Sequence, residues 1–172
     1  LYLKAVSLSS DPAPTREALQ LLERAVALDP RFAPAFAEKA RRHYFYANYD
    51  RGGAAAIAAA RRAAQRALEL EPDYQDAARS LVIYDTEAGE VVAAYKEALE
   101  LVRRRPRSAD AHFVMSYVLR YAGRLEEAAR KCEVARSLDP AAGLRSCAIV
   151  YVHLGNYDRA RDFAGLDEGS EW

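Results

Sequence analysis

The stretch Tyr121-Ala-Gly-Arg-Leu-Glu-Glu-Ala128, followed by Ala135-Arg-Ser-Leu-Asp-Pro140, contains the pattern that decides the fold. Its markers are Gly123, Ala128, Ala135 and Pro140. Glycine ends a helix cheaply because a left-handed cap has no Cβ to clash. Proline ends the next helix because it lacks an N–H and disfavours helix in the residue before it. The two alanines share one face of the intervening helix, where they let a partner helix approach closely.

The same markers recur along the chain. Four prolines lie 42, 34 and 34 residues apart, at Pro30, Pro72, Pro106 and Pro140. An alanine stands twelve residues before each of them, at Ala18, Ala60, Ala94 and Ala128. Five residues before each proline stand Ala25, Ala67, Leu101 and Ala135. Gly155 and Ala160 begin one further copy. The pattern therefore predicts a helix, a tight turn, a second helix and a second turn in each repeat.

A helical hairpin with a period of 34 residues resembles the tetratricopeptide repeat (TPR) family. The resemblance covers nearly the whole chain and implies an all-α fold, a right-handed α-solenoid of about four and a half TPR helix hairpins. We expect a single solenoid over residues 1–172. Its repeats span about 1–30, 31–72, 73–106, 107–140 and 141–165, and a frayed tail covers 166–172.

Two repeats depart from a regular period. In the first, we expect helices at about Leu1 to Leu8 and Thr15 to Leu28, with Pro12 and Pro14 in the loop between them. The second is eight residues too long, and we place the excess near Asn48 to Ala56, where two glycines mark the turn. Irregular lengths of this kind resemble the TPR tails of bacterial multidomain regulators.

Charge and hydropathy exclude several classes of protein. The 25 Lys and Arg residues balance the 25 Asp and Glu residues, so the net charge is zero and no basic arm or patch for nucleic acid or membrane is evident. No apolar run approaches the roughly 18 residues of a membrane span, and no signal peptide is visible. We expect a cytoplasmic protein with no nucleic-acid or membrane partner. Because the chain begins at Leu1, we interpret it as a piece of a longer protein.

No catalytic pattern is present in the sequence. It lacks a glycine-rich phosphate loop, an HExxH motif and a GxSxG motif. His43, His112 and His153 lie near packing positions, where we expect hydrogen-bonded filler residues rather than a base or a metal ligand. We therefore expect no enzyme, no cofactor and no metal site.

The two cysteines and the arginine runs receive structural interpretations. Cys132 and Cys147 flank the turn near Pro140, so we predict two buried thiols close together that pack as small apolar groups. A redox switch is the alternative, which requires Cα atoms within about 7 Å and solvent access. The run from Arg103 to Arg107 suits a helix C-terminus. We expect Arg61, Arg62 and Arg66 to be solvated or paired with Glu69.

Stacked hairpins form a concave groove lined mainly by the first helix of each repeat. The side chains expected to point into it include aromatics and arginines, which are enriched at interface hot spots. The candidates are Arg41, Tyr44, Phe45, Arg79, Ile83, Phe113, Tyr117, Arg120, Tyr121, Arg145 and Val152. The arginines suit carboxylates of a partner, or alternatively they are solvated and paired with nearby Glu. The aromatics suit anchors in a peptide or helix complex, or alternatively they pack between repeats.

These observations predict a non-catalytic scaffold that binds a protein partner: a peptide, a helix or a neighbouring domain. The alternative is a structural or self-associating segment of a larger bacterial signalling or transcriptional regulator, forming homo-oligomers through open solenoid ends. A nucleic-acid binder is a third class, which a salt-dependent affinity for DNA or RNA would reveal.

Overall fold

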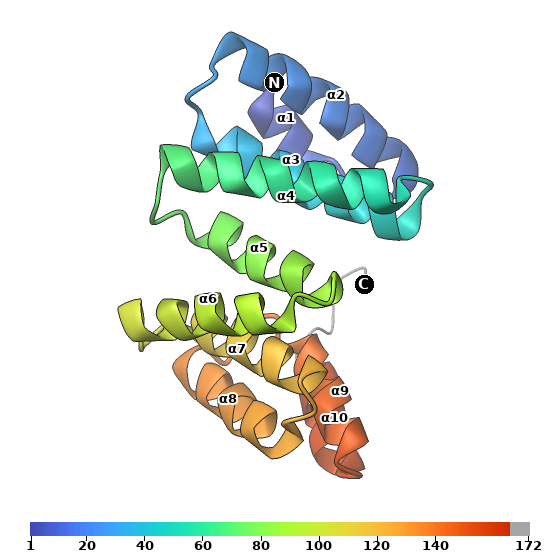
Figure 1. The fold of residues 1–172 in the computed structure, drawn as a ribbon. Coiled ribbons are helices and arrows are strands. Elements are labelled where there is room, and N and C mark those ends of the chain that lie inside the picture. The colour runs from blue at the N-terminus through green and yellow to red at the C-terminus, as the bar shows by residue number, and fades with distance from the viewer. Residues whose placement is uncertain (166–172) are drawn as a thin grey trace. The chain divides into compact units, whose positions relative to one another are not determined.

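The computed structural model describes residues 1–165, which contain helices and no strand. The all-α prediction is therefore confirmed for this part of the chain, and the tail expected over 166–172 lies outside it. The helices come in the predicted order, two for each repeat (Figure 1). The chain divides into two compact units, residues 1–84 and the residues from Asp85 onward. A single continuous solenoid over both units stays a prediction.

The first unit contains α1 (Tyr2–Ser7), α2 (Pro12–Leu28), α3 (Ala33–Tyr49) and α4 (Gly53–Leu70). The second contains α6 (Val91–Arg104), α7 (Ala109–Tyr121), α8 (Leu125–Leu138), α9 (Arg145–His153) and α10 (Tyr157–Ala164). Helix α5 (Gln75–Glu87) is shared, since the first unit ends at Tyr84. Within the units, α1 packs against α2, α3 against α4, α7 against α8, and α9 against α10.

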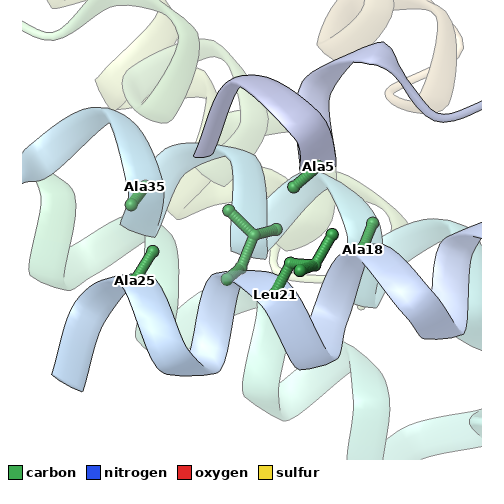
Figure 2. Packing of buried hydrophobic residues seen from close by; sticks show 6 residues of the cluster. Ala5, Ala18, Leu21, Ala25 and Ala35 are labelled. Carbon is green, nitrogen blue, oxygen red and sulfur yellow. The ribbon is translucent and has the colours of Figure 1, made fainter. Parts of the chain in front are cut away.

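The alanines of the repeat pattern are buried. Ala18, Ala60, Ala94 and Ala128 are fully inaccessible, and Ala160 is 6% exposed. In the first hairpin, Ala18, Leu21 and Ala25 of α2 pack with Ala5 of α1 and Ala35 of α3 (Figure 2). Side chains this small let neighbouring helix backbones approach closely, which is the role that the sequence pattern predicts for them.

The glycine of the repeat ends the first helix in three successive hairpins. Gly89, Gly123 and Gly155 have φ angles of 88°, 73° and 72°. This left-handed region is unfavourable for residues that carry a Cβ. After Gly123, the Arg124 N–H donates to the Leu119 carbonyl at 2.9 Å and closes the end of α7. The predicted turn chemistry is confirmed at these positions.

The extra residues of the second repeat extend its helices. Helix α3 has 17 residues and α4 has 18, whereas α5 and α7 have 13 and α6 and α8 have 14. Helix α3 is therefore about one turn longer than α5 and α7, and α4 is about one turn longer than α6 and α8, whereas α2 of the first repeat already has 17 residues. The added residues meet at the turn before Gly53, the region where the sequence places the excess.

Two helix starts differ from the expected ones. Helix α2 begins at Pro12 rather than near Thr15, because proline is tolerated in the first helical turn, where its missing N–H has no intrahelical acceptor. The fifth repeat begins its first helix at Arg145, after a turn in which the Ala141 N–H donates to the Asp139 carboxylate at 2.9 Å. Its two helices have only nine and eight residues.

The two cysteines are buried and close together, as predicted, but they are not free thiols. Cys132 of α8 and Cys147 of α9 form a disulfide, with Cα atoms 5.8 Å apart and both side chains fully inaccessible. Ser116 of α7 places its hydroxyl 3.1 Å from the Cys132 sulfur. The prediction of two thiols is wrong because the turn brings the two helices within bonding distance. The burial also removes the solvent access that the redox-switch alternative requires.

Reduction of this disulfide is expected to lower the free energy of unfolding by about 3 kcal/mol, because the bond closes a loop of 15 residues. Urea unfolding with and without reductant measures the difference. The double variant Cys132→Ala/Cys147→Ala is the control, since reductant should leave its unfolding unchanged. Equal stability of the oxidised and reduced wild-type protein would contradict the structural role of the bond.

A buried arginine of α3 binds the end of α1 through hydrogen bonds. Arg42 is fully inaccessible, and its guanidinium donates to the carbonyls of Ala5 at 2.9 Å and Leu8 at 2.7 Å, and also to that of Ser9. Its Nε donates to the Glu38 carboxylate at 2.7 Å. These carbonyls belong to the end of α1 and the loop that follows it. The Ala5 carbonyl also accepts the Leu8 N–H at 3.4 Å. Arg42 therefore supplies donors to carbonyls at a helix end, where the regular helical hydrogen bonds stop. Arg42 is not among the residues predicted from the sequence to have a special role.

Replacement of Arg42 by Met is expected to lower the free energy of unfolding by about 3 kcal/mol, because buried carbonyls lose their donors. Amide hydrogen exchange in residues 2–8 should also accelerate. Arg41→Met is the matched control, since Arg41 is 40% exposed and pairs with the same Glu38. It should cost less than about 1 kcal/mol. Similar losses in the two variants would show that Arg42 does not hold α1.

A second polar network joins α8, α9 and α10. Arg159 of α10 forms a two-pronged ion pair with Glu133 of α8, and the Tyr151 hydroxyl of α9 donates to the same carboxylate. The hydrogen bonds from Arg159 lower the pKa of Glu133. Burial, and then the hydrogen bond to Glu133, raise the pKa of Tyr151 to about 12. The Tyr151 ring stacks on Phe163 with centroids 5.3 Å apart, so the last hairpin is held by both polar and aromatic contacts.

Candidate binding surface

The first helices of the first three repeats surround a cavity of about 280 Å³ in the first unit. Helix α1 contributes Tyr2, α3 contributes Arg41 and Glu38, and α5 contributes Asp76 and Arg79. The full lining is Tyr2, Pro34, Ala37, Glu38, Arg41, Tyr74, Asp76, Arg79 and Ser80. Two of the predicted groove residues, Arg41 and Arg79, therefore lie at one cavity.

The cavity combines charges of both signs with two tyrosine hydroxyls. Arg41 is held by a bidentate pair with Glu38, with N–O distances of 2.8 and 2.6 Å. Burial, and then the charges of Glu38 and Asp76, raise the pKa of Tyr2. Burial, and then Tyr2 and Asp76, raise the pKa of Tyr74. Both phenols are therefore hydrogen-bond donors at neutral pH, beside an arginine whose orientation is fixed.

Other predicted residues of the first unit serve packing. The Tyr44 ring stacks on Tyr84 with centroids 4.9 Å apart; Tyr84 belongs to the buried core between α3, α4 and α5, and Tyr44 is partly buried against it. Ile83 packs against the same core. The Phe45 ring lies 5.5 Å from the Arg41 guanidinium and pairs with Tyr49 at 5.8 Å. Tyr44 and Ile83 are thus internal supports, which is the alternative that the sequence left open for the aromatics.

In the second unit, an arginine lies against two tyrosine rings. The Arg120 guanidinium is 4.8 Å from the Tyr117 ring centroid and 4.6 Å from that of Tyr121. Its Nη2 also lies 3.5 Å from the Ser146 hydroxyl of α9. The Tyr117 hydroxyl donates to Glu87, which fixes the ring. Cation–π contacts of this kind order the arginine without neutralising its charge. Tyr121, at 45% exposure, is the accessible part of this cluster.

The remaining candidates are divided between interior and surface. Phe113 is only 5% exposed and its ring contacts that of Tyr117, so it packs on the buried side of the Arg120, Tyr117 and Tyr121 cluster. Arg145 begins α9 and is exposed. Val152, on the same helix, is 49% exposed and Ile149 is 42% exposed. Helix α9 therefore presents an apolar surface that a partner could cover.

Tyr2, Tyr74 and Asp76 are among the cavity residues that lie outside the predicted set. Tyr2 is absent from the predicted set because α1 has only six residues and too few positions to establish a register. Tyr74 precedes α5, and Asp76 lies in its first turn. The prediction considers only side chains on regular first helices, so residues at the entrance to a helix carry no periodic signal.

The remaining sequence predictions concern the arginine runs, the histidines, metal sites and membrane spans. Arg66 pairs with Glu69 at 2.8 Å, and Arg103 and Arg104 lie in the last turn of α6, as expected. His112 is buried, with Nε2 2.9 Å from the Pro106 carbonyl oxygen, as expected of a packed residue. The same expectation is wrong for His153, which is exposed near the end of α9. Over residues 1–165, no cluster of three His, Cys, Asp or Glu side chains has the arrangement of a metal site. No helix in that range has the length and apolar character of a membrane span.

Comparison with known proteins shows which solved structures have a similar fold. No family model and no curated protein matches the sequence. Among solved structures, TTC0263, a thermophilic TPR protein of Thermus thermophilus, has a TM-score of 0.75 at 20% identity, covering 92% of this chain and 84% of that one. MamA from AMB-1 has a TM-score of 0.60 at 21% identity, covering 98% of both chains.

A third neighbour is the segment of MamA from residue 41 to its end from Desulfovibrio magneticus RS-1. It has a TM-score of 0.59 at 16% identity and covers 90% of this chain and 85% of that one. The chain therefore has a TPR-like fold, and the prediction of TPR helix hairpins is confirmed. At these identities the likeness concerns the fold alone.

The two kinds of aromatic candidate should differ in their effect on stability. Tyr44→Ala is expected to lower the free energy of unfolding by about 2 kcal/mol, because it removes a partly buried ring that stacks on Tyr84 of the core. Tyr121→Ala should cost less than about 1 kcal/mol, because that ring is half exposed. Urea unfolding of both variants measures the difference. A larger loss in Tyr121→Ala would reverse the assignment of support and surface.

Proposed function

We propose that this chain is a non-catalytic protein-interaction module that binds an extended peptide or a helix of a partner on the first helices of its repeats. Several features support the proposal. The first unit offers a cavity with donors of fixed orientation, and the second offers an accessible tyrosine beside an ordered arginine. Tyrosine and arginine are the residue types that most often dominate binding energy at protein interfaces.

The Arg120 cluster is the single observation that carries this proposal. Its guanidinium keeps a positive charge while two rings limit its conformations, so a partner carboxylate would bind it with little further loss of side-chain entropy. Tyr121 and the exposed apolar residues of α9 would supply adjacent apolar contact. A peptide that places an acidic side chain next to an apolar one suits this surface.

A random-peptide display selection against the immobilised protein tests the proposal. We expect enriched peptides to carry an acidic residue close to a large apolar one. Because hot-spot truncations cost about 2 kcal/mol or more, Tyr121→Ala and Arg120→Ala should each weaken the enriched peptides by more than about tenfold. Calorimetric titration with synthetic peptides measures the affinities.

Tyr157→Ala is the matched control, since Tyr157 is a 66% exposed tyrosine on α10 that lies outside this cluster. It should leave the affinity unchanged. Absence of enrichment, or equal affinity of the enriched peptides for the Arg120→Ala variant, would contradict binding at this surface. Thermal unfolding of each variant excludes global misfolding as the cause of lost binding.

Self-association is the second candidate function, as part of a larger bacterial signalling or transcriptional regulator. The observation that favours it is an apolar surface at α1, where Leu3 is 80% exposed and Val6 is 42% exposed, next to Leu1, which precedes the helix and is 42% exposed. Sedimentation at increasing concentration distinguishes this candidate, because a second copy covering α1 would raise the mass. Leu3→Glu should then restore the mass of the single chain.

The remaining features of the proposed role concern compartment and excluded partners. We propose that neither nucleic acid nor membrane is a partner, consistent with the zero net charge. The cytoplasm stays a prediction, and the Cys132–Cys147 bond bears on it, because such bonds persist mostly in oxidising compartments. Counting the free thiols of the protein, trapped by alkylation directly on cell lysis, distinguishes a reducing from an oxidising compartment: two free thiols indicate the first and none the second.

A further inference from the structure

A second pocket of the first unit, of about 180 Å³, has a lining of one charge sign. Helix α3 contributes Lys39 and His43, and α4 contributes Arg62 and Arg66. Phe36, Ala59 and Ala63 complete the wall, and no acidic side chain lines the pocket. The groove proposed above uses none of these side chains.

The helix register explains how these residues converge. Lys39 and His43 are four residues apart on α3, and Arg62 and Arg66 are four residues apart on α4, so each pair shares one helix face. Glu38 and Arg41, which line the first cavity, lie on a different face of α3. The two helices are long and pack directly on one another, so the pocket is built on a rigid hairpin.

The positive charges of the pocket are only partly balanced. Lys39 pairs with Glu23 of α2, and Arg66 pairs with Glu69 at 2.8 Å. Arg62 is exposed and forms no ion pair with any residue in the range 1–165. One positive charge therefore faces the pocket without a carboxylate, and two more have partners that lie outside the lining. An anion placed here would meet donors from both helices.

We propose that this pocket binds a phosphate group, as inorganic phosphate or as a phosphate monoester, between Arg62 and Arg66 of α4 and the Lys39 side of α3. Two arginines supply planar pairs of N–H donors, and the ammonium group of Lys39 has donors beyond the one used by Glu23. The His43 imidazole supplies a further donor when it is protonated. A phosphate dianion matches this set better than chloride, which has one charge and a single acceptor atom.

The environment of His43 makes binding measurable. Burial lowers the pKa of His43, and the charges of Lys39 on its own helix and Arg62 on α4 lower it further. Glu23 of α2 acts in the opposite direction. An anion beside the imidazole favours its charged form, so phosphate binding should raise the pKa of His43. Ordinary salt screening of Lys39 and Arg62 also raises it, so comparisons must be made at equal ionic strength.

The test follows the imidazole C–H resonances by NMR during pH titrations of the whole chain. Separate titrations contain sodium chloride, inorganic phosphate or O-phosphoserine, all at one ionic strength. We expect phosphate to raise the pKa of His43 above its value in chloride, with a saturable dependence on concentration. The resonances of His112 and His153 are internal references, because neither residue lines this pocket. The two phosphate probes distinguish the free ion from a phosphorylated side chain as the preferred source.

Arg62→Gln should weaken phosphate binding by about fivefold, a loss typical of one partly exposed charge pair. Because Arg62 is exposed, the variant should keep the thermal unfolding of the wild-type chain. Arg24→Gln, which removes an exposed arginine outside the pocket lining, is the matched control and should leave binding unchanged.

Several results would overturn the proposal. They are an equal rise of the His43 pKa in chloride, the absence of a rise with both phosphate probes, and unchanged binding in Arg62→Gln. Tight binding of duplex DNA that Arg62→Gln abolishes would also overturn it, since the site would then belong to a polyanion surface rather than to a single phosphate group.

Discussion

Close approach of helix backbones at small side chains is the constraint on which the rest of this structure depends. Ala18, Ala60, Ala94 and Ala128 are fully buried, and each occupies the same place in its repeat. A larger side chain at these positions would separate the two helices, because protein interiors have no room for added volume without strain. This pairing determines which face each helix buries and which face it leaves exposed, while glycine and proline set where each helix ends.

The pairing gives α3 two separate polar faces. One contributes Glu38 and Arg41 to a cavity of mixed charge, and another contributes Lys39 and His43 to a cationic pocket. Helix α3 is about one turn longer than α5 and α7, which gives the hairpin a longer wall. Of the long charged side chains on α3, Arg41 is 40% exposed, whereas Arg42 is fully buried and is used inside the fold. The repeat thus supplies a rigid frame, and the non-repeated residues supply the chemistry.

The sequence predicts the frame well and the sites only in part. Helix pairs, glycine caps and the position of the long hairpin can be predicted because the same residue types recur at the same positions of each repeat. The sequence does not distinguish a packed Tyr44 from an accessible Tyr121, since both are tyrosines on first helices. Only the fold shows that Tyr44 stacks on Tyr84 against a core. Arg42 also has no sequence signal, because its carbonyl partners lie more than 30 residues away. The disulfide depends on the turn geometry between α8 and α9, which spacing alone does not determine.

The most direct test of this account compares two adjacent alanines of α6. Ala94 is fully buried at a repeat position, whereas Ala93 is exposed. Leucine has nearly the same helix propensity as alanine, so the two substitutions differ mainly in the added volume at a helix contact. The measurement is the free energy of urea unfolding of Ala94→Leu and Ala93→Leu. The account predicts a loss of about 2 kcal/mol for Ala94→Leu and less than about 0.5 kcal/mol for Ala93→Leu. Equal losses would contradict the claim that small side chains at the repeat positions set the helix pairing.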